Sequence, residues 1–298
     1  MAANSARVHV VTDSTADLPR ALADELRITV VPLTIVFGAE SFRDGVDLTA
    51  DEFYERLQTA HDLPTTAQPP PALFEHAYRH LTSQGDVVSV HLSEKFSGTV
   101  NAARAAAAAV APGQIEVIDS GSVSMGLGLC AIAAARCAAA GGSREECAGE
   151  ARSVAARLDV AVAFETLEYL RRGGRIGRAQ AFVGGLLRLK PILTVRDGEA
   201  HPVTRVRSHA KALDELAALI GKHAPVSNVV VMHTTTPGDC DALAARAREL
   251  APEAELMSGR FGPVLGAHGG PGMLGIAVVE APREGAAPPS TSSIRRSS

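Results

Sequence analysis

The chain has 298 residues and a formal net charge of -4 at pH 7. This length is enough for a sizeable core and predicts two domains, while the acidic balance argues against a general nucleic-acid binder. Hydrophobic residues make up 46% of the chain but aromatic residues only 4%, so the core is expected to be aliphatic.

The four cysteines, at positions 130, 137, 147 and 240, form no C-x-x-C pair, and three lie in Ala-rich, helix-like sequence. We therefore expect buried free thiols and neither a disulfide nor a metal site. No window reaches the roughly 18 apolar residues of a membrane span, and the first residues lack the apolar run of a signal peptide. A cytoplasmic protein without membrane insertion is the expectation.

In chain order, Val- and Ile-rich runs bounded by turn residues predict strands at 7–14, 86–93, 114–120, 158–165, 228–235 and 274–280. Apolar residues at helical spacing, Ala-rich runs or an N-terminal proline predict helices at 19–26, 67–84, 97–111, 209–224 and 239–251. Alternating strands and helices indicate an α/β protein with a largely parallel sheet.

The segment 191–208 has a different pattern, because Asp197-Gly198 separates two alternating runs. This arrangement predicts a β-hairpin and suggests a second domain after the Ala-rich helix that ends near Gly142. We place the domains at 1–145 and 146–282. The Pro- and Ser-rich segment 283–298 is expected to be a disordered tail.

Polar residues follow three predicted strands: Thr12 to Thr15, Ser93 with the segment 96–99, and Asp119-Ser120. Ligands of open α/β sheets bind beyond the carboxyl ends of the strands, and a helix N-terminus favours anions. For any one element the alternative is simple capping, with Ser97 at the N-cap of its helix. Three such elements together favour a ligand site.

Thr66 precedes the helix predicted at 67–84 and has two interpretations. Its hydroxyl can cap that helix, or it can bind a ligand next to Ser97. The residues leave both open.

His268 stands within the segment 261–275, which holds six glycines and two prolines. Such glycine content is typical of a backbone with positive φ or close approach. We therefore expect His268 on a tight loop at the edge of a sheet, where it is either a functional ring or an incidental turn residue.

The segment 168–190 carries six cations on an acidic chain: Arg171, Arg172, Arg175, Arg178, Arg188 and Lys190. Arginine forms paired hydrogen bonds with phosphate and carboxylate groups, so this patch can meet an acidic or phosphorylated partner. The alternative is a solvated surface with ion pairs to Glu165 and Glu168. Arg205 and Arg207 alternate to one face and can extend the patch.

Common enzyme signatures are missing, including G-x-x-x-x-G-K-[ST], H-E-x-x-H, G-x-S-x-G and a G-x-G-x-x-G after a strand. The chain therefore shows no nucleotide site of its own. A serine and a histidine can form a nucleophile and base, but no oxyanion hole or orienting third residue is indicated. Two hypotheses remain open at this point. One is an enzyme in which Ser97 and His268 hydrolyse an acyl ester or phosphate, and the other is a protein that binds a small anion.

Taken in order, the motifs resemble the DegV family of bacterial lipid-binding proteins over nearly all of the first 280 residues. The matching segments are Asp13-Ser14-Thr15, Thr66-Ala67-Gln68-Pro69, Ser93 to Thr99, Val117 to Ser120, Tyr169 to Ile176, Lys190-Pro191-Ile192 and Gly262 to Gly272. Each motif is short, but the ordered set is specific.

The resemblance implies two α/β domains with a ligand tunnel between them, the first a three-layer sandwich with a parallel sheet and the second a smaller domain with a mixed sheet. It implies a long-chain fatty acid as ligand, no cofactor or metal, and a non-catalytic carrier, which we expect to be a monomer. A separate ATP-dependent fatty acid kinase would convert the bound carboxylate to an acyl phosphate for phospholipid synthesis.

Carried over by motif, the residues expected to hydrogen-bond the carboxylate are Thr66, Ser97 and His268. Weaker candidates for ligand or partner contacts are Asp13, Ser14, Gly98, Thr99, Arg172, Arg175 and Arg205. A buried carboxylate needs such partners, and a protonated imidazole would favour its ionised form.

Two positions depart from the family pattern. Ala67 replaces the usual serine and removes a hydroxyl, and Glu94-Lys95 replaces Ser-Gly, which makes that loop stiffer and charged. These changes bear on which ligand is bound.

Overall fold

The computed structural model describes residues 7–182 and 189–282. A parallel sheet has the order β2-β1-β6-β7, formed by β1 (Val8–Asp13), β2 (Ile28–Val31), β6 (Asp86–His91) and β7 (Ile115–Asp119). A mixed sheet has the order β10-β9-β8-β13-β11-β12. Its strands are β8 (Leu158–Ala163), β9 (Lys190–Arg196), β10 (Glu199–Val206), β11 (Val226–His233), β12 (Glu255–Arg260) and β13 (Leu274–Glu280). The two-part α/β architecture is therefore confirmed.

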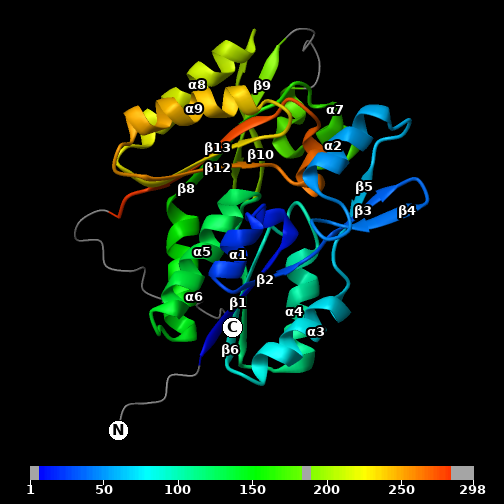
Figure 1. Cartoon of the computed structure of the whole chain (residues 1–298), viewed down its shortest axis with the longest axis vertical. Helices are drawn as coiled ribbons and strands as arrows, with labels where there is room; N and C mark the ends of the chain where they lie inside the picture. Colours follow the sequence, from blue (N-terminus) through cyan, green and yellow to red (C-terminus); the bar gives the residue numbers. More distant parts are fainter. Residues whose placement is uncertain (1–6, 183–188, 283–298) are drawn as a thin grey trace, which may run out of the picture.

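Helices cover both faces of the parallel sheet, which gives the expected three layers (Figure 1). On one face lie α3 (Pro71–Thr82) and α4 (Thr99–Val110), and on the other lie α1 (Arg20–Glu25), α5 (Met125–Ala139) and α6 (Arg144–Arg157). The outer face of the mixed sheet is covered by α8 (His209–His223) and α9 (Pro237–Leu250). Aliphatic residues fill these interfaces, as the composition indicates.

The two sheets share one continuous core. It joins Val10 and Val88 of the parallel sheet, through α5, to Val160 and Ala277 of the mixed sheet. α6 packs against β6 and β7, and the mixed sheet begins at Leu158. The boundary expected after residue 145 thus falls inside α6. The second sheet has six strands against four in the first.

A third, small sheet has the order β4-β3-β5 and comes from the chain between β2 and α3. It consists of β3 (Thr34–Phe37), β4 (Glu40–Arg43) and β5 (Thr65–Ala67), with α2 (Ala50–Thr59) inserted before β5. With α2 it packs on α10 (Pro263–Gly269) through a separate apolar cluster. The strand patterns missed this unit because its strands have only three or four residues each.

The six strands predicted from sequence and the hairpin are confirmed. Asp197 (φ 51°) and Gly198 (φ 77°) take the positive φ that a tight two-residue hairpin turn demands. The predicted tight loop around His268 is wrong, because that residue lies near the end of the helix α10. The prolines and glycines of the segment 261–275 lie largely at the ends of this helix, where both residue types are favoured.

Candidate functional site

A cavity of about 370 Å³ lies between the mixed sheet and the loops at the carboxyl edge of the parallel sheet. Its volume is in the range of small-molecule sites. Most of its wall is aliphatic or aromatic: Leu33, Leu92, Phe96, Val123, Val160, Val162, Phe164, Leu170, Leu193, Val195, Ala200, Phe261, Val264, Leu265 and Met273. Such a wall suits an apolar ligand.

Polar groups gather at one part of this wall. Thr66 on β5, Gln68 just after it, Ser97 before α4, His268 on α10 and Arg175 after α7 (Glu168–Arg172) all line the cavity. Thr66 Oγ1 lies 2.8 Å from His268 Nε2, across 202 residues of sequence. The three residues expected to bind a carboxylate therefore line one cavity.

The His268 ring is largely buried. Burial and, to a lesser extent, the neighbouring Arg175 guanidinium lower its pKa to about 4. With this pKa, the neutral imidazole is the favoured form at pH 7 when no ligand is bound. Its Nδ1 is buried and has no hydrogen-bond partner, so one polar atom of the ring is available for a proton or a donor.

The capping interpretations of Thr66 and Ser97 are wrong. Thr66 lies in β5 and bonds His268, while Pro70 holds the N-cap of α3 without a side-chain bond. Gly98 is the N-cap of α4, and Ser97 Oγ lies 2.9 Å from Thr99 Oγ1. Both hydroxyls therefore belong to the cavity wall.

Gly98 has a local steric role. A Cβ at this position would lie 2.1 Å from the side-chain oxygen of Gln68. The absent side chain thus lets the Gln68 amide lie beside the loop that carries Ser97. Gln68 was not singled out from the sequence, although it belongs to the matched Thr66–Pro69 motif.

The hydrogen bonds of Ser97 and His268 join each to a threonine rather than to one another. A nucleophile–base pair would need a direct contact. The arrangement therefore does not favour the serine hydrolase hypothesis.

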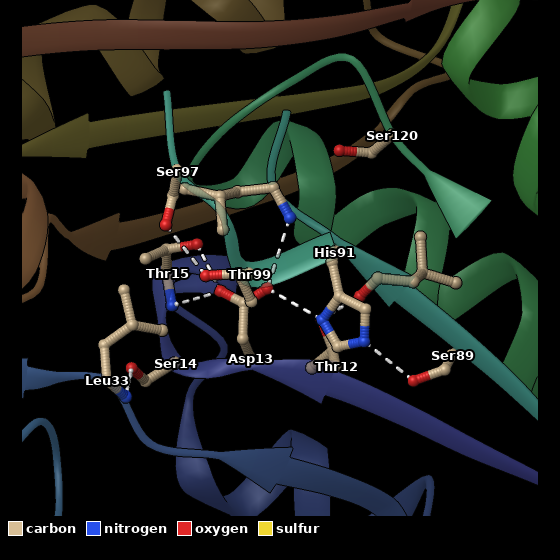
Figure 2. Close-up of polar contacts among 12 residues, drawn as sticks. Thr12, Asp13, Ser14, Thr15, Leu33, Ser89, His91, Ser97, Thr99 and Ser120 are labelled. Atoms are coloured by element: carbon tan, nitrogen blue, oxygen red, sulfur yellow. Dashed lines mark hydrogen bonds and ion pairs between the residues drawn. The ribbon is translucent and has the colours of Figure 1, made fainter. Parts of the chain in front are cut away.

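Asp13 is fully buried and is not part of the cavity wall. Figure 2 shows its polar contacts with the neighbouring residues. Its carboxylate accepts bonds from the Thr15 amide and hydroxyl and from the Leu92 amide, and its Oδ2 lies 2.9 Å from His91 Nδ1. His91 Nε2 in turn lies 2.7 Å from Ser89 Oγ. Asp13 is thus surrounded by protein donors, and it is Thr15 that lines the cavity.

Ser14 and Thr99 were also candidates for ligand contact. Ser14 Oγ accepts a bond from the Leu33 amide, and Thr99 is fully buried against Ser97. Ser14, Thr99 and Gly98 are not part of the cavity wall. These residues support the loops that carry Thr15 and Ser97.

The arginine candidates separate into three environments. Arg175 lines the cavity and donates to the carbonyl oxygens of Phe96 and Gly173. Arg172 pairs with Glu168 and lines an adjoining recess of about 320 Å³, which shares Thr66, Arg175 and His268 with the cavity. Arg205 lies over the Phe182 ring, 4.1 Å from its centroid, and away from the cavity.

Much of the expected basic patch is paired with acidic residues. Arg171 and Arg172 bond Glu168, Lys190 bonds Glu165, and Arg178 bonds Glu199. Arg188 lies outside the described residues. The expected ion pairs with Glu165 and Glu168 are thus formed by Arg171, Arg172 and Lys190, whereas Arg178 pairs with Glu199. Of the patch cations in the described part of the chain, Arg175 reaches the cavity.

Among residues 7–182 and 189–282, no helix is long and apolar enough to cross a membrane. The same residues contain no cluster of three or more His, Cys, Asp or Glu placed to hold a metal ion. All four cysteines are free thiols, three of them buried.

The fold and the cavity define an α/β protein with two large sheets, a third small sheet and an amphipathic site. A family model described as uncharacterised proteins of the DegV family matches residues 7–281. A DegV domain-containing protein of Streptomyces coelicolor is 42% identical over 280 residues, which cover 92% of this chain and 99% of the relative. The chain belongs to the DegV family.

Solved structures agree with this assignment. A fatty-acid-binding DegV family protein from Thermus thermophilus superposes with a TM-score of 0.85 at 34% identity, covering 92% of this chain and all of that one. DegV from Bacillus subtilis, described as a fatty acid binding protein, gives 0.85 at 32% identity, covering 93% of this chain and 100% of its own. A stearic-acid-binding protein from Eubacterium ventriosum gives 0.85 at 26% identity, covering 92% and 98%.

Proposed function

We propose that this protein binds a long-chain fatty acid in the cavity between its two sheets and presents the carboxylate to a separate ATP-dependent fatty acid kinase. In this role it is a monomeric cytoplasmic carrier, and catalysis belongs to the kinase. The observation that carries the proposal is the cavity itself, whose wall is mostly apolar but also holds the bonded pair Thr66 and His268 and the hydroxyl of Ser97. The fatty-acid-binding relatives support the same ligand class.

The head group requires hydrogen bonds because a buried, unpaired carboxylate is costly. The hydroxyls of Thr66 and Ser97 and the Gln68 amide can donate, while Arg175 supplies a positive charge nearby. His268 is neutral before binding, and an arriving carboxylate would favour its protonation. The tail contributes about 0.8 kcal/mol per buried CH₂, so affinity comes from the tail and orientation from the head.

The recess beside the head group supports a role in presentation. It lies between the Leu63–Thr66 segment and α7, and it shares three residues with the fatty-acid cavity. Arg172 and Arg175 both line it, so a phosphoryl group formed on the carboxylate would meet positive charge. The kinase would approach from this side.

The first experiment is mass spectrometry of the freshly purified protein under native and denaturing conditions. We expect a mass excess in the native state that is released as free long-chain fatty acid. A protein that is free of ligand and stays so after incubation with C14 to C20 acids contradicts the proposal.

Ser97→Ala and His268→Ala test the head-group assignment. Each should weaken fatty-acid binding by about tenfold, since a buried partner is left without its bond, and should slow acyl phosphate formation with a bacterial fatty acid kinase and ATP. Ser83→Ala and His61→Ala, at exposed positions, are the matched controls. Unchanged binding and phosphorylation in both site variants would remove Ser97 and His268 from the site.

A further inference from the structure

The two ends of the cavity differ in chemistry. At the polar end, His268 is followed by Gly269, where a Cβ would lie 3.3 Å from Cε1 of Phe164. Phe164 directly follows β8, and its side chain lies in the cavity wall together with Val162 and Val160. Because alternate residues of a strand share a face, these three side chains lead from the head-group region along β8.

The strand β9 runs beside β8 and continues the same part of the cavity wall, which we call the floor. Val162 of β8 is opposite Leu193 of β9, and continuing the antiparallel register by two residues on each strand brings Val160 beside Val195. Val195 is in turn opposite Ala200 of β10. The last row of the floor is therefore built from three small aliphatic side chains.

Beyond this row lies a separate polar cleft of about 660 Å³. Its wall carries charged side chains from both halves of the molecule: Glu94, Lys95, Asp119, Arg157, Asp159, Arg196, Asp197, His223 and Glu280. Val160 and Val195 line the cleft as well as the apolar cavity. These two valines thus separate the apolar cavity from the charged cleft.

We propose that Val160 and Val195 form the stop for the methyl end of the bound acyl chain and so set the longest chain that the protein accepts. This inference rests on the proposed fatty-acid binding. The polar residues orient the carboxylate at one end, and the floor of β8 and β9 directs the tail toward the valine pair. A tail that passed the pair would enter a charged, wet cleft and gain no further burial.

Each CH₂ buried contributes about 0.8 kcal/mol, or about fourfold in Kd. In the wild-type protein, affinity should rise by this factor with chain length and then stop rising once the methyl end reaches the pair. The position of that break is the quantity that the valines control.

The test is a titration of the purified, delipidated protein with saturated acids from C12 to C22, read by native mass spectrometry and by isothermal calorimetry. The double variant Val160→Ala/Val195→Ala should move the break to longer acids, with a gain of about fourfold for each CH₂ that fills the space left by the two valine side chains. Val162→Ala is the matched control, because Val162 lies on the same face of β8 but outside the charged cleft. It should weaken all lengths alike and leave the break in place.

Val195→Phe provides an independent test if the double variant does not fold. Val195 is half-buried, so a larger side chain has room toward the cleft and toward the cavity. It should move the break to shorter acids. Wild-type protein that binds no acid from C12 to C22 would overturn the proposed function and this inference with it. Wild-type binding with an unchanged break in the folded valine variants would overturn the inference alone.

Discussion

Asp44 shows how burial changes the chemistry of a single residue. It is 4% exposed. Burial, opposed by a hydrogen bond from Ser14 and aided by the Asp13 charge, raises the pKa of its carboxyl to about 7. Its Oδ2 has no hydrogen-bond partner. The folded protein therefore favours the protonated acid.

Asp44→Asn should change the dependence of stability on pH. Because the folded-state pKa lies above the unfolded value of 3.8, the stabilisation from the neutral acid is full below that value and is lost as the pH rises toward 7. An amide stays neutral throughout. The free energy of unfolding of the variant, relative to that of wild type, should therefore be higher at pH 8 than at pH 4, by at most about 4 kcal/mol. Thermal unfolding at the two pH values measures this difference.

Asp47→Asn is the control for this measurement. Asp47 is near Asp44 in sequence, but bonds from Arg43 lower the pKa of its carboxyl to about 2. A lowered pKa makes stability change with pH in the opposite direction, because the contribution of the ionised carboxylate is present above pH 4 and is lost below it. The effect should be small, because the Arg43–Asp47 pair is exposed. Parallel stability curves for wild type and Asp44→Asn would contradict the assignment of a buried neutral acid.

At the scale of elements, the site depends on the contact between α7 and α10. Gly173 is the C-cap of α7, and a Cβ there would lie 2.3 Å from His268 Nδ1. The glycine allows the ring to approach the backbone closely while its other nitrogen reaches Thr66. Two short elements far apart in sequence thus hold one side chain.

Gly173→Ala should displace the His268 ring from Thr66 and weaken fatty-acid binding by about tenfold, since one head-group partner is lost. Fluorescent fatty-acid displacement measures this change. Gly149→Ala in α6 is the control, because Gly149 is exposed and nothing lies within 4 Å of its added Cβ. That variant should bind normally and be more stable by about 0.5–1 kcal/mol. Normal binding by Gly173→Ala would show that the ring position is not critical.

At the scale of the whole molecule, Asp17 joins the two halves. Its carboxyl lies between Ser124 Oγ, at 2.6 Å, and the Gly262 amide, at 3.0 Å. Burial raises the pKa of Asp17 well above its ordinary value, so the group is expected to be neutral. It connects the parallel-sheet half to the segment that enters α10.

Asp17→Asn should fold with a stability within about 1 kcal/mol of wild type. The Asn oxygen can accept from the Gly262 amide as the carboxyl does, and the Ser124 hydroxyl, which donates to the carboxyl, can turn to accept from the Asn nitrogen. Asn also tolerates the φ of 51° at this position. Asp17→Ala should lose about 2–4 kcal/mol, because buried partners are left unpaired and the backbone is strained. Urea unfolding followed by circular dichroism measures both. Equal losses in the two variants would mean that the charged form is required.

The strand and helix patterns did not predict β2, β12 or α6. They did predict most other elements of the two large sheets, because periodicity and turn residues act over a few positions. β13 and the turn at Asp197-Gly198 are examples. Helix α10 was predicted wrongly as a loop, since its glycines and prolines resemble turn residues and its seven residues are too few to show a helical period. The small sheet that carries Thr66 has strands of three or four residues, which leave little pattern.

The sequence by itself determined the α/β class, the aliphatic core and the family, and its motifs pointed to Thr66, Ser97 and His268. The tertiary structure decided that these residues share one cavity, that burial lowers the pKa of His268, and that Asp13 supports the wall instead of lining it. It also placed Val160 and Val195 in the walls of both the cavity and the charged cleft. The reason is physical: secondary structure arises from neighbours in the chain, whereas burial, charge and cavity shape depend on residues that folding brings together from as far apart as 202 positions.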